Sequence, residues 1–232
     1  MIQTPPNLIA SLNAEHPGNT KPNQISEGQN ITVTMMVQNA GEATAKNVKP
    51  SDLKVAGNAA LALPPSPSEY DISSGESRTF TWIYNTAMGS DGSITFSGCA
   101  SGTDFNSGDS IKTSDMISNP MTIQTSAHLE VTSLRVENPN NPIKTQISGG
   151  QSITLTMVVK NSGVATAKDV YVDTPSWPGS GTATLINPKP EKVTIAGGRE
   201  QTFEWSWITT SDNAAENLVF DASVTGTDFN FN

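Results

Sequence analysis

The sequence predicts an all-β protein built from a duplicated antiparallel β-sandwich. Two observations support this fold class. Residues 29–48, QNITVTMMVQNAGEATAKNV, recur as QSITLTMVVKNSGVATAKDV at 151–170, with 13 of 20 positions identical and an offset of 122 residues. Within each copy apolar and polar residues alternate with the period of a strand, and the i, i+3, i+4 spacing of an amphipathic helix is missing.

The repeated segment begins with a half-buried strand. One side of the extended chain carries Ile31, Val33, Met35 and Val37. Asn39 to Gly41 then interrupt the strand with turn residues that tolerate positive φ, after which extended structure resumes. We interpret each copy as a β-arch or a hairpin.

The duplication continues beyond this segment. SGESRTFTW at 74–82 matches GGREQTFEW at 197–205, and SGTDFN at 101–106 matches TGTDFN at 225–230. We therefore expect one domain at 1–125 and a second at 126–232. The second has no counterpart of residues 107–125, so we expect it to be truncated before its last strand, as in a piece of a longer tandem array. An uncovered sheet edge would favour weak self-association by strand addition.

Clusters of Pro, Gly and Asn separate the expected strands. In the first copy these strands are 8–12, 31–39, 43–48, 59–63, 70–72, 79–84, 94–101 and 117–124. Many short strands without a helical stretch give about seven strands per domain, which is the size of an immunoglobulin-like antiparallel sandwich. The proline-rich residues 63–68 are expected to connect the two sheets.

Composition limits the function classes. The formal net charge is −9, from 13 basic and 22 acidic residues, so no nucleic-acid partner is expected. No apolar run is long enough for a membrane span, and no membrane contact is expected from this fragment. The single cysteine leaves no disulfide framework or Cys-based zinc site within the chain. The Ser, Thr and Asn content favours an extracellular or cell-surface setting.

The order of these motifs resembles the cell adhesion related domain found in bacteria, the CARDB family. The resemblance rests on the ITVTM, ATA, Phe-x-Trp and GTD segments, and it covers nearly the whole chain twice. It implies tandem immunoglobulin-like modules in exported surface polypeptides. Neighbouring repeats of the same polypeptide would then be partners, and a cell-surface protein or polysaccharide could be another. The resemblance does not imply a common ligand.

One loop carries a candidate metal site. Asp104, Asn106 and Asp109 place oxygen ligands two or three residues apart, as at the start of a calcium loop, although the glutamate that closes an EF-hand is missing. The alternative is an Asx turn between two strands, with no cofactor. The second copy retains Asp228 and Asn230.

Aromatic side chains offer a second candidate. Phe80, Trp82 and Tyr84 alternate along one strand, which predicts a core face rather than a sugar-stacking strip. Trp177 lies in an expected loop without an aromatic counterpart in the first copy. We therefore consider Trp177 a candidate ligand-binding residue, with Trp207 as its partner.

The cysteine and the histidines are not shared between the copies. Cys99 aligns with Ser223 and is expected on the polar face of its strand. His16 and His128 align with asparagines, so no repeated histidine site is expected.

No group of base, nucleophile and orienting residue suggests an enzyme. We expect a non-catalytic structural or adhesive module that acts as a spacer or protein-interaction domain. The alternative is an accessory carbohydrate-binding module of a secreted enzyme.

Overall fold

The computed structural model describes residues 2–19, 21–143, 146–175, 183–187, 191–210 and 219–231. Within these ranges the chain is all-β, with several antiparallel sheets. The described residues form no helix that could span a membrane. The chain divides into two compact units, one ending at Thr125 and one covering Ser126–Phe231, which we call unit 1 and unit 2.

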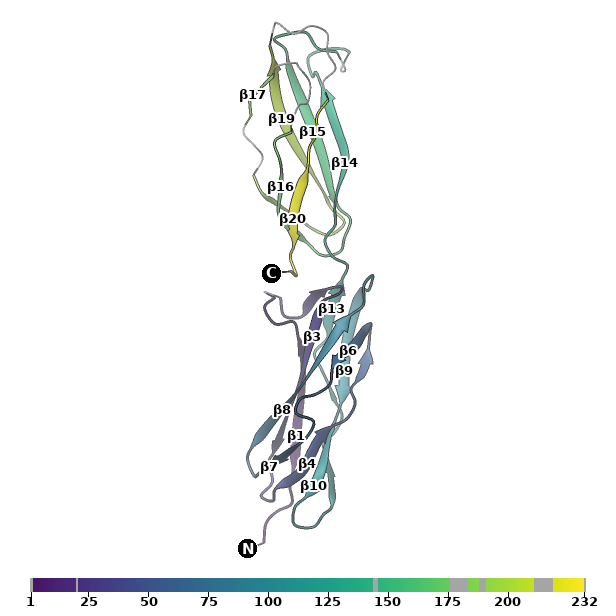
Figure 1. The fold of residues 1–232 in the computed structure, drawn as a ribbon, viewed down its shortest axis with the longest axis vertical. Helices are drawn as coiled ribbons and strands as arrows, with labels where there is room; N and C mark the ends of the chain where they lie inside the picture. Colours follow the sequence, from purple (N-terminus) through teal and green to yellow (C-terminus); the bar gives the residue numbers. More distant parts are fainter. Residues whose placement is uncertain are drawn as a thin grey trace. The chain divides into compact units, whose positions relative to one another are not determined.

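Three sheets form unit 1. One has the order β1-β3-β8-β6, another β11-β10-β4-β7, and the third β12-β9-β13-β2 with β5 also paired to β9 (Figure 1). The bounds are β1 Leu8–Glu15, β2 Gln24–Ser26, β3 Asn30–Asn39, β4 Ala45–Pro50, β5 Lys54–Ala56, β6 Ala59–Leu63, β7 Tyr70–Ile72, β8 Ser77–Thr86, β9 Gly92–Gly98, β10 Ala100–Asp104, β11 Ser110–Lys112, β12 Met116–Ile117 and β13 Met121–Gln124.

Two sheets form the described part of unit 2, with orders β14-β15-β19-β17 and β18-β16-β20. In Figure 1 β14 and β17 form the two edges of the larger sheet. The bounds are β14 Leu129–Glu137, β15 Ser152–Asn161, β16 Ala167–Val172, β17 Ala183–Leu185, β18 Val193–Ile195, β19 Glu200–Thr209 and β20 Val224–Asp228. The described strand pairs are antiparallel, except that β13 pairs with β2 in parallel.

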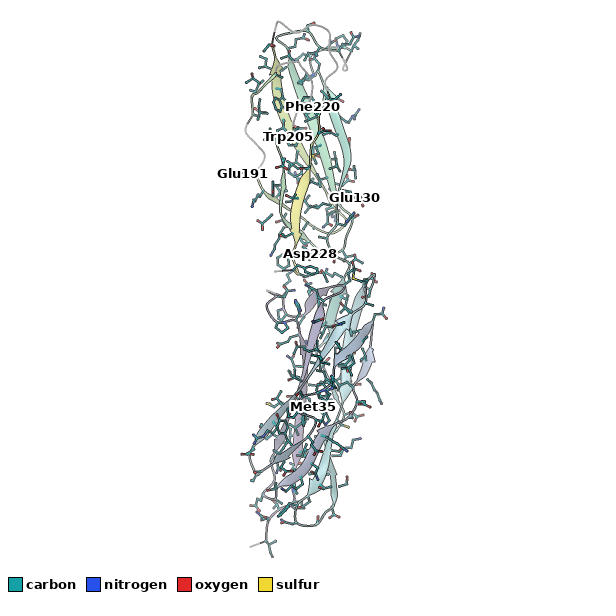
Figure 2. The ribbon with its side chains drawn as sticks, in the orientation of Figure 1. Met35, Glu130, Glu191, Trp205, Phe220 and Asp228 are labelled. Carbon is teal, nitrogen blue, oxygen red and sulfur yellow. The ribbon has the colours of Figure 1, made fainter. Side chains whose placement is uncertain are left out.

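Each unit has its own apolar core, filled by the alternating side chains of its central strands. In unit 1, Val33 lies opposite Trp82 and Met35 opposite Phe80 in the β3–β8 register, and all four side chains are buried. In unit 2, Met157 pairs with Phe203 in the same way. Figure 2 labels Met35 in the interior of unit 1, and Trp205 and Phe220 in that of unit 2. The predicted alternation and core assignment are confirmed.

The repeated segment is an arch, not a hairpin. β3 pairs with β1 and β8, whereas β4 belongs to the sheet containing β10 and β7. The chain therefore crosses from one sheet to another between Asn39 and Ala45. β15 and β16 repeat this crossing in unit 2. A hairpin would leave both strands in one sheet.

Glycine at the arch is required for a reason other than the expected positive φ. The main chain before β1 passes so close to Gly41 that an added Cβ would overlap the carbonyl oxygen of Pro5. A Cβ on Gly163 would likewise overlap the carbonyl oxygen of Ser126. Positive φ occurs instead at Asn47 (48°) and at its counterpart Asp169 (51°), where the β4 and β16 pairings shift register.

Replacing Gly41 or Gly163 by alanine is therefore expected to destabilise the unit that carries it. Relieving a backbone overlap by local movement costs about 1–3 kcal/mol, as overpacking does elsewhere. Thermal or urea unfolding measures this loss. The exposed neighbour Ala40 provides the control, because Ala40→Ser adds an atom without meeting the passing main chain and should leave stability unchanged.

Several strand boundaries differ from expectation. The strand expected at 94–101 is broken at Cys99 into β9 and β10, which belong to different sheets. The strand expected at 117–124 is interrupted at residues 118–120, where Pro120 lacks the N–H that a ladder requires. Three short strands, β2, β5 and β11, were not predicted.

Candidate functional site

A fully buried asparagine holds the arch of each unit together. Asn39 ends β3 and its side chain has no exposed surface. Its Oδ1 accepts hydrogen bonds from the main-chain N–H of Asn7 (3.1 Å) and of Gly41 (3.0 Å). Its Nδ2 donates to the carbonyl oxygens of Ala43 (2.8 Å) and Ile72 (3.0 Å). One side chain thus joins three segments far apart in sequence.

Asn161 repeats this arrangement in unit 2. Its Oδ1 accepts from the N–H of His128 (3.0 Å) and of Gly163 (3.2 Å), and its Nδ2 donates to Ala165 (2.8 Å) and Ile195 (3.0 Å). A planar amide offers two donors and two acceptor positions. In both asparagines all four form hydrogen bonds with main-chain N–H and carbonyl groups. We call each of these residues the arch asparagine. Both residues were expected only in a turn, and their role in the arch was not predicted. The available signal was that asparagine ends the repeated strand in both copies.

The loop of the candidate calcium site is hydrogen-bonded internally. Asp104 is 6% exposed, and its Oδ1 accepts the Asn106 N–H at 2.8 Å, which is an Asx turn. The Asp104 N–H donates to the Asp109 carbonyl oxygen (2.9 Å), and the Asn106 side chain donates to Gln3 (3.1 Å). Among the described residues no three His, Cys, Asp or Glu side chains gather as a metal-binding group.

The second copy of this motif uses its aspartate more completely. Asp228 Oδ1 accepts the Asn230 N–H at 2.8 Å, while Oδ2 accepts the Ala127 N–H at 2.7 Å. The position of Ala127 in unit 1 is Pro6, which has no N–H to donate. The shared GTDFN motif therefore ends its strand in both units, and in unit 2 it also secures the start of the unit (Figure 2 labels Asp228).

Calcium binding at Asp104, Asn106 and Asp109 stays a prediction. Calcium takes six or more oxygen ligands, and Asn106 would contribute its amide oxygen, because its Nδ2 donates to Gln3. If calcium binds, its addition raises the melting temperature of the chain, and Asp109→Asn abolishes the rise. A melting temperature that calcium leaves unchanged would favour the Asx turn alone.

The aromatic strip of β8 lies in the core, since its side chains are 0%, 2% and 3% exposed at Phe80, Trp82 and Tyr84. The predicted core role of this strip is confirmed.

Trp177, the candidate ligand-binding residue, lies outside the described residues. Its expected partner Trp207 is half-buried, and its ring packs against Phe220 with centroids 6.0 Å apart.

The expected position of Cys99 was wrong. Its side chain is 8% exposed instead of lying on an exposed polar face. The strand breaks at this residue, so the alternation from Ile94 no longer applies. The Cys99 N–H approaches Ser51 Oγ at 3.1 Å, and its carbonyl oxygen accepts the Ser51 N–H at 2.8 Å. These bonds connect Cys99, which lies between β9 and β10, to Ser51, which directly follows β4.

An exposed ion pair supports the bulge in β4. Lys46 Nζ lies 2.7 Å from Asp71 Oδ2, and Asp71 Oδ1 accepts the N–H of Asn47 at 3.0 Å. The hydrogen bond from Lys46, followed by that from Asn47, lowers the pKa of Asp71 below its ordinary value of 3.8. The carboxylate thus stabilises the positive-φ residue at the bulge.

This ion pair gives a pH-dependent contribution to stability. Because the pKa of Asp71 is lower in the folded state, its contribution is present above about pH 3.8 and is lost as the pH falls through the folded value. Asp71→Asn should therefore lower the unfolding midpoint slightly at pH 7, and the difference from the parent chain should vanish once the pH is below the lowered pKa of Asp71. The exposed Asp91→Asn is the control. A difference that persists at low pH would contradict the assignment.

Comparisons with known proteins identify no family. No family model matches the chain, and no curated protein matches it. Among solved structures, the secreted serine protease VesC from Vibrio cholerae is similar at 10% identity and a TM-score of 0.29, over 93% of this chain and 50% of that one. The native conformation of E. coli alpha-2-macroglobulin is similar at 11% identity and a TM-score of 0.30, over 94% of this chain and 16% of that one. At these scores neither likeness bears on fold or activity.

Proposed function

We propose that the chain is a tandem pair of immunoglobulin-like sandwich modules, 1–125 and 126–232, of the CARDB type. It acts as a non-catalytic spacer or protein-interaction module of a larger exported or cell-surface protein. Neighbouring repeats of the same polypeptide are its nearest partners.

The main observation behind this proposal is that the repeated polar residues bond to main-chain groups and hold strands together. The arch asparagines Asn39 and Asn161 are fully buried and bond only to main-chain groups. The repeated aspartates Asp104 and Asp228 accept main-chain N–H groups at strand ends. Duplication has thus preserved residues that hold strands together, as expected where the repeated unit is selected for its fold.

The surface chemistry also supports the proposal. The net charge of −9 and sequence pI of about 4.6 give an acidic exterior without a basic patch for nucleic acid. The repeated aromatic residues Phe80, Trp82, Phe203 and Trp205 lie in the cores, whereas Phe105 of the repeated GTDFN motif is 64% exposed.

Binding and turnover measurements on the chain test this function. Tryptophan fluorescence should not respond to a panel of bacterial and plant polysaccharides, and hydrolase screens should show no turnover. A saturable fluorescence change abolished by Trp177→Ala would instead establish a carbohydrate-binding module. Turnover abolished by a single substitution would establish an enzyme.

A further inference from the structure

One outer sheet face of unit 1 carries almost no charge. It belongs to the sheet β1-β3-β8-β6, whose opposite face packs on the core. The outward residues alternate with the buried ones and are Ile9, Ser11, Asn13 and Glu15 on β1, Asn30, Thr32, Thr34, Met36 and Gln38 on β3, Ser77, Thr79, Thr81, Ile83 and Asn85 on β8, and Ala60 and Leu63 on β6. We call this surface the neutral face. Among these described residues, Glu15 at one end of β1 is the single charged one.

The fold does not require this neutrality, because unit 2 has charged residues on the same face. The strand registers of the two units align Ile9 with Glu130, Asn13 with Arg135, Gln38 with Lys160, Ser77 with Glu200 and Thr81 with Glu204. Two copies of a chain with a net charge of −9 repel each other, and they do so least where they meet through uncharged side chains. The centres of protein interfaces are likewise depleted in charged residues.

Exposed apolar side chains lie toward the two ends of the neutral face. Ile9 is 52% exposed and Met36 is 50% exposed, and both lie toward the end where β1 begins. Toward the other end, Leu63 is 59% exposed and lies opposite the half-buried Ile83. Exposed apolar groups that share one surface are typical of interaction sites.

We propose that the neutral face is a contact site for a second copy of this chain, packed face to face across a two-fold axis. Thr34 pairs with Thr81 at the middle of the face, and Met36 and Ile83 follow two residues away on opposite sides of this pair. A two-fold axis through the threonine pair therefore lays Met36 of one copy on Ile83 of the other. In such an isologous contact the same residues serve both copies.

The chemistry of the neutral face favours a second copy over other occupants. None of the described residues that form it is aromatic, because Phe80, Trp82 and Tyr84 point into the core, so it offers no ring on which a sugar could stack. A strongly charged partner would find only Glu15 as a counterpart. A second copy brings the same uncharged side chains and the same two apolar ends.

The contact is expected to be weak. The ten residues of β3 span about 33 Å and the sheet is about 14 Å wide from β1 to β6, so each copy would contribute roughly 450 Å². Stable interfaces bury about 800 Å² on each partner. We therefore expect a reversible dimer that forms at high micromolar concentration. This inference goes beyond the proposed spacer function and does not depend on it.

Sedimentation velocity of the full chain, from low micromolar to millimolar concentration, tests the proposal. The sedimentation coefficient should rise with concentration. Thr81→Glu should raise the dissociation constant at least about tenfold, because the axis brings the two introduced carboxylates together. The fold should accept this change, since Glu204 has the same position in unit 2. Thr202→Glu adds the same charge to the outer face of unit 2 and should dimerise like the parent chain.

Mixing two variants gives a second readout. Thr81→Glu and Thr81→Lys should each be monomeric alone and should form a heterodimer together, because opposite charges then meet at the axis. Met36→Thr should weaken the dimer without adding a charge.

A chain that stays monomeric at millimolar concentration would overturn the proposal. A dimer that Thr81→Glu leaves intact would also overturn it, since such a dimer would form through another surface, such as a sheet edge. A monomer that binds a neutral polysaccharide, with binding abolished by Thr81→Glu, would overturn it in favour of a sugar site.

Discussion

Asn39→Asp is expected to destabilise unit 1 by about 3 kcal/mol or more, because each buried carbonyl left without its donor costs about 1–3 kcal/mol. The change is nearly isosteric, so it leaves packing intact. It replaces the amide that donates to Ala43 and Ile72 with an oxygen facing two carbonyl oxygens. Asn161→Asp should have the same effect on unit 2, where Ala165 and Ile195 lose their donor.

Urea unfolding with separate probes for the two units measures this effect. Asn13→Asp, at an exposed position of β1, is the matched control and should change stability little. Acid should reduce the damage from Asn39→Asp, because burial raises the pKa of the introduced carboxyl and its protonated form can donate one hydrogen bond. A loss below about 1 kcal/mol would show that the arch does not depend on this side chain.

Trp82→Ala and Trp205→Ala are each expected to cost about 3–5 kcal/mol, as for large aromatic residues removed from a packed core. Both side chains are at most 2% exposed and belong to central strands. Thermal unfolding should show a lower midpoint only for the unit that carries the substitution, because the two cores consist of separate residues.

Exposed residues on the same strands provide the controls for these tryptophans. Thr79 and Glu204 lie on the outward side of β8 and β19. Thr79→Ala and Glu204→Ala should each change the free energy of unfolding by no more than about 0.5 kcal/mol. A mild effect of Trp82→Ala on stability would contradict its assignment to the core.

Long alternating strands were predictable from the sequence, whereas among the three-residue strands of unit 1 only β7 was predicted. β3 and β8 carry enough alternation to fix both their extent and their buried face. Cys99 was misplaced because a strand break shifts every following residue, and no residue type marks that break. The duplicated sequence indicated which positions matter but not why, as the arch asparagines show.

The tripeptide Gln-Ile-Ser shows a limit of any local prediction. Its copies at residues 24–26 and 146–148 are identical, yet only residues 24–26 form a strand. Their partner β13 lies almost 100 residues further along the chain, from Met121 to Gln124. Strand formation by so short a segment depends on long-range pairing, which local propensity cannot supply.

Limited protease treatment of intact native cells, with mass spectrometry of the released peptides and of the parent polypeptide, tests the proposed function most directly. We expect peptides of both units to be released from a parent that carries further repeats. Peptides released only after cell lysis would contradict the proposed surface setting. A parent consisting of these two units joined to a catalytic domain would contradict the spacer function and favour an accessory module.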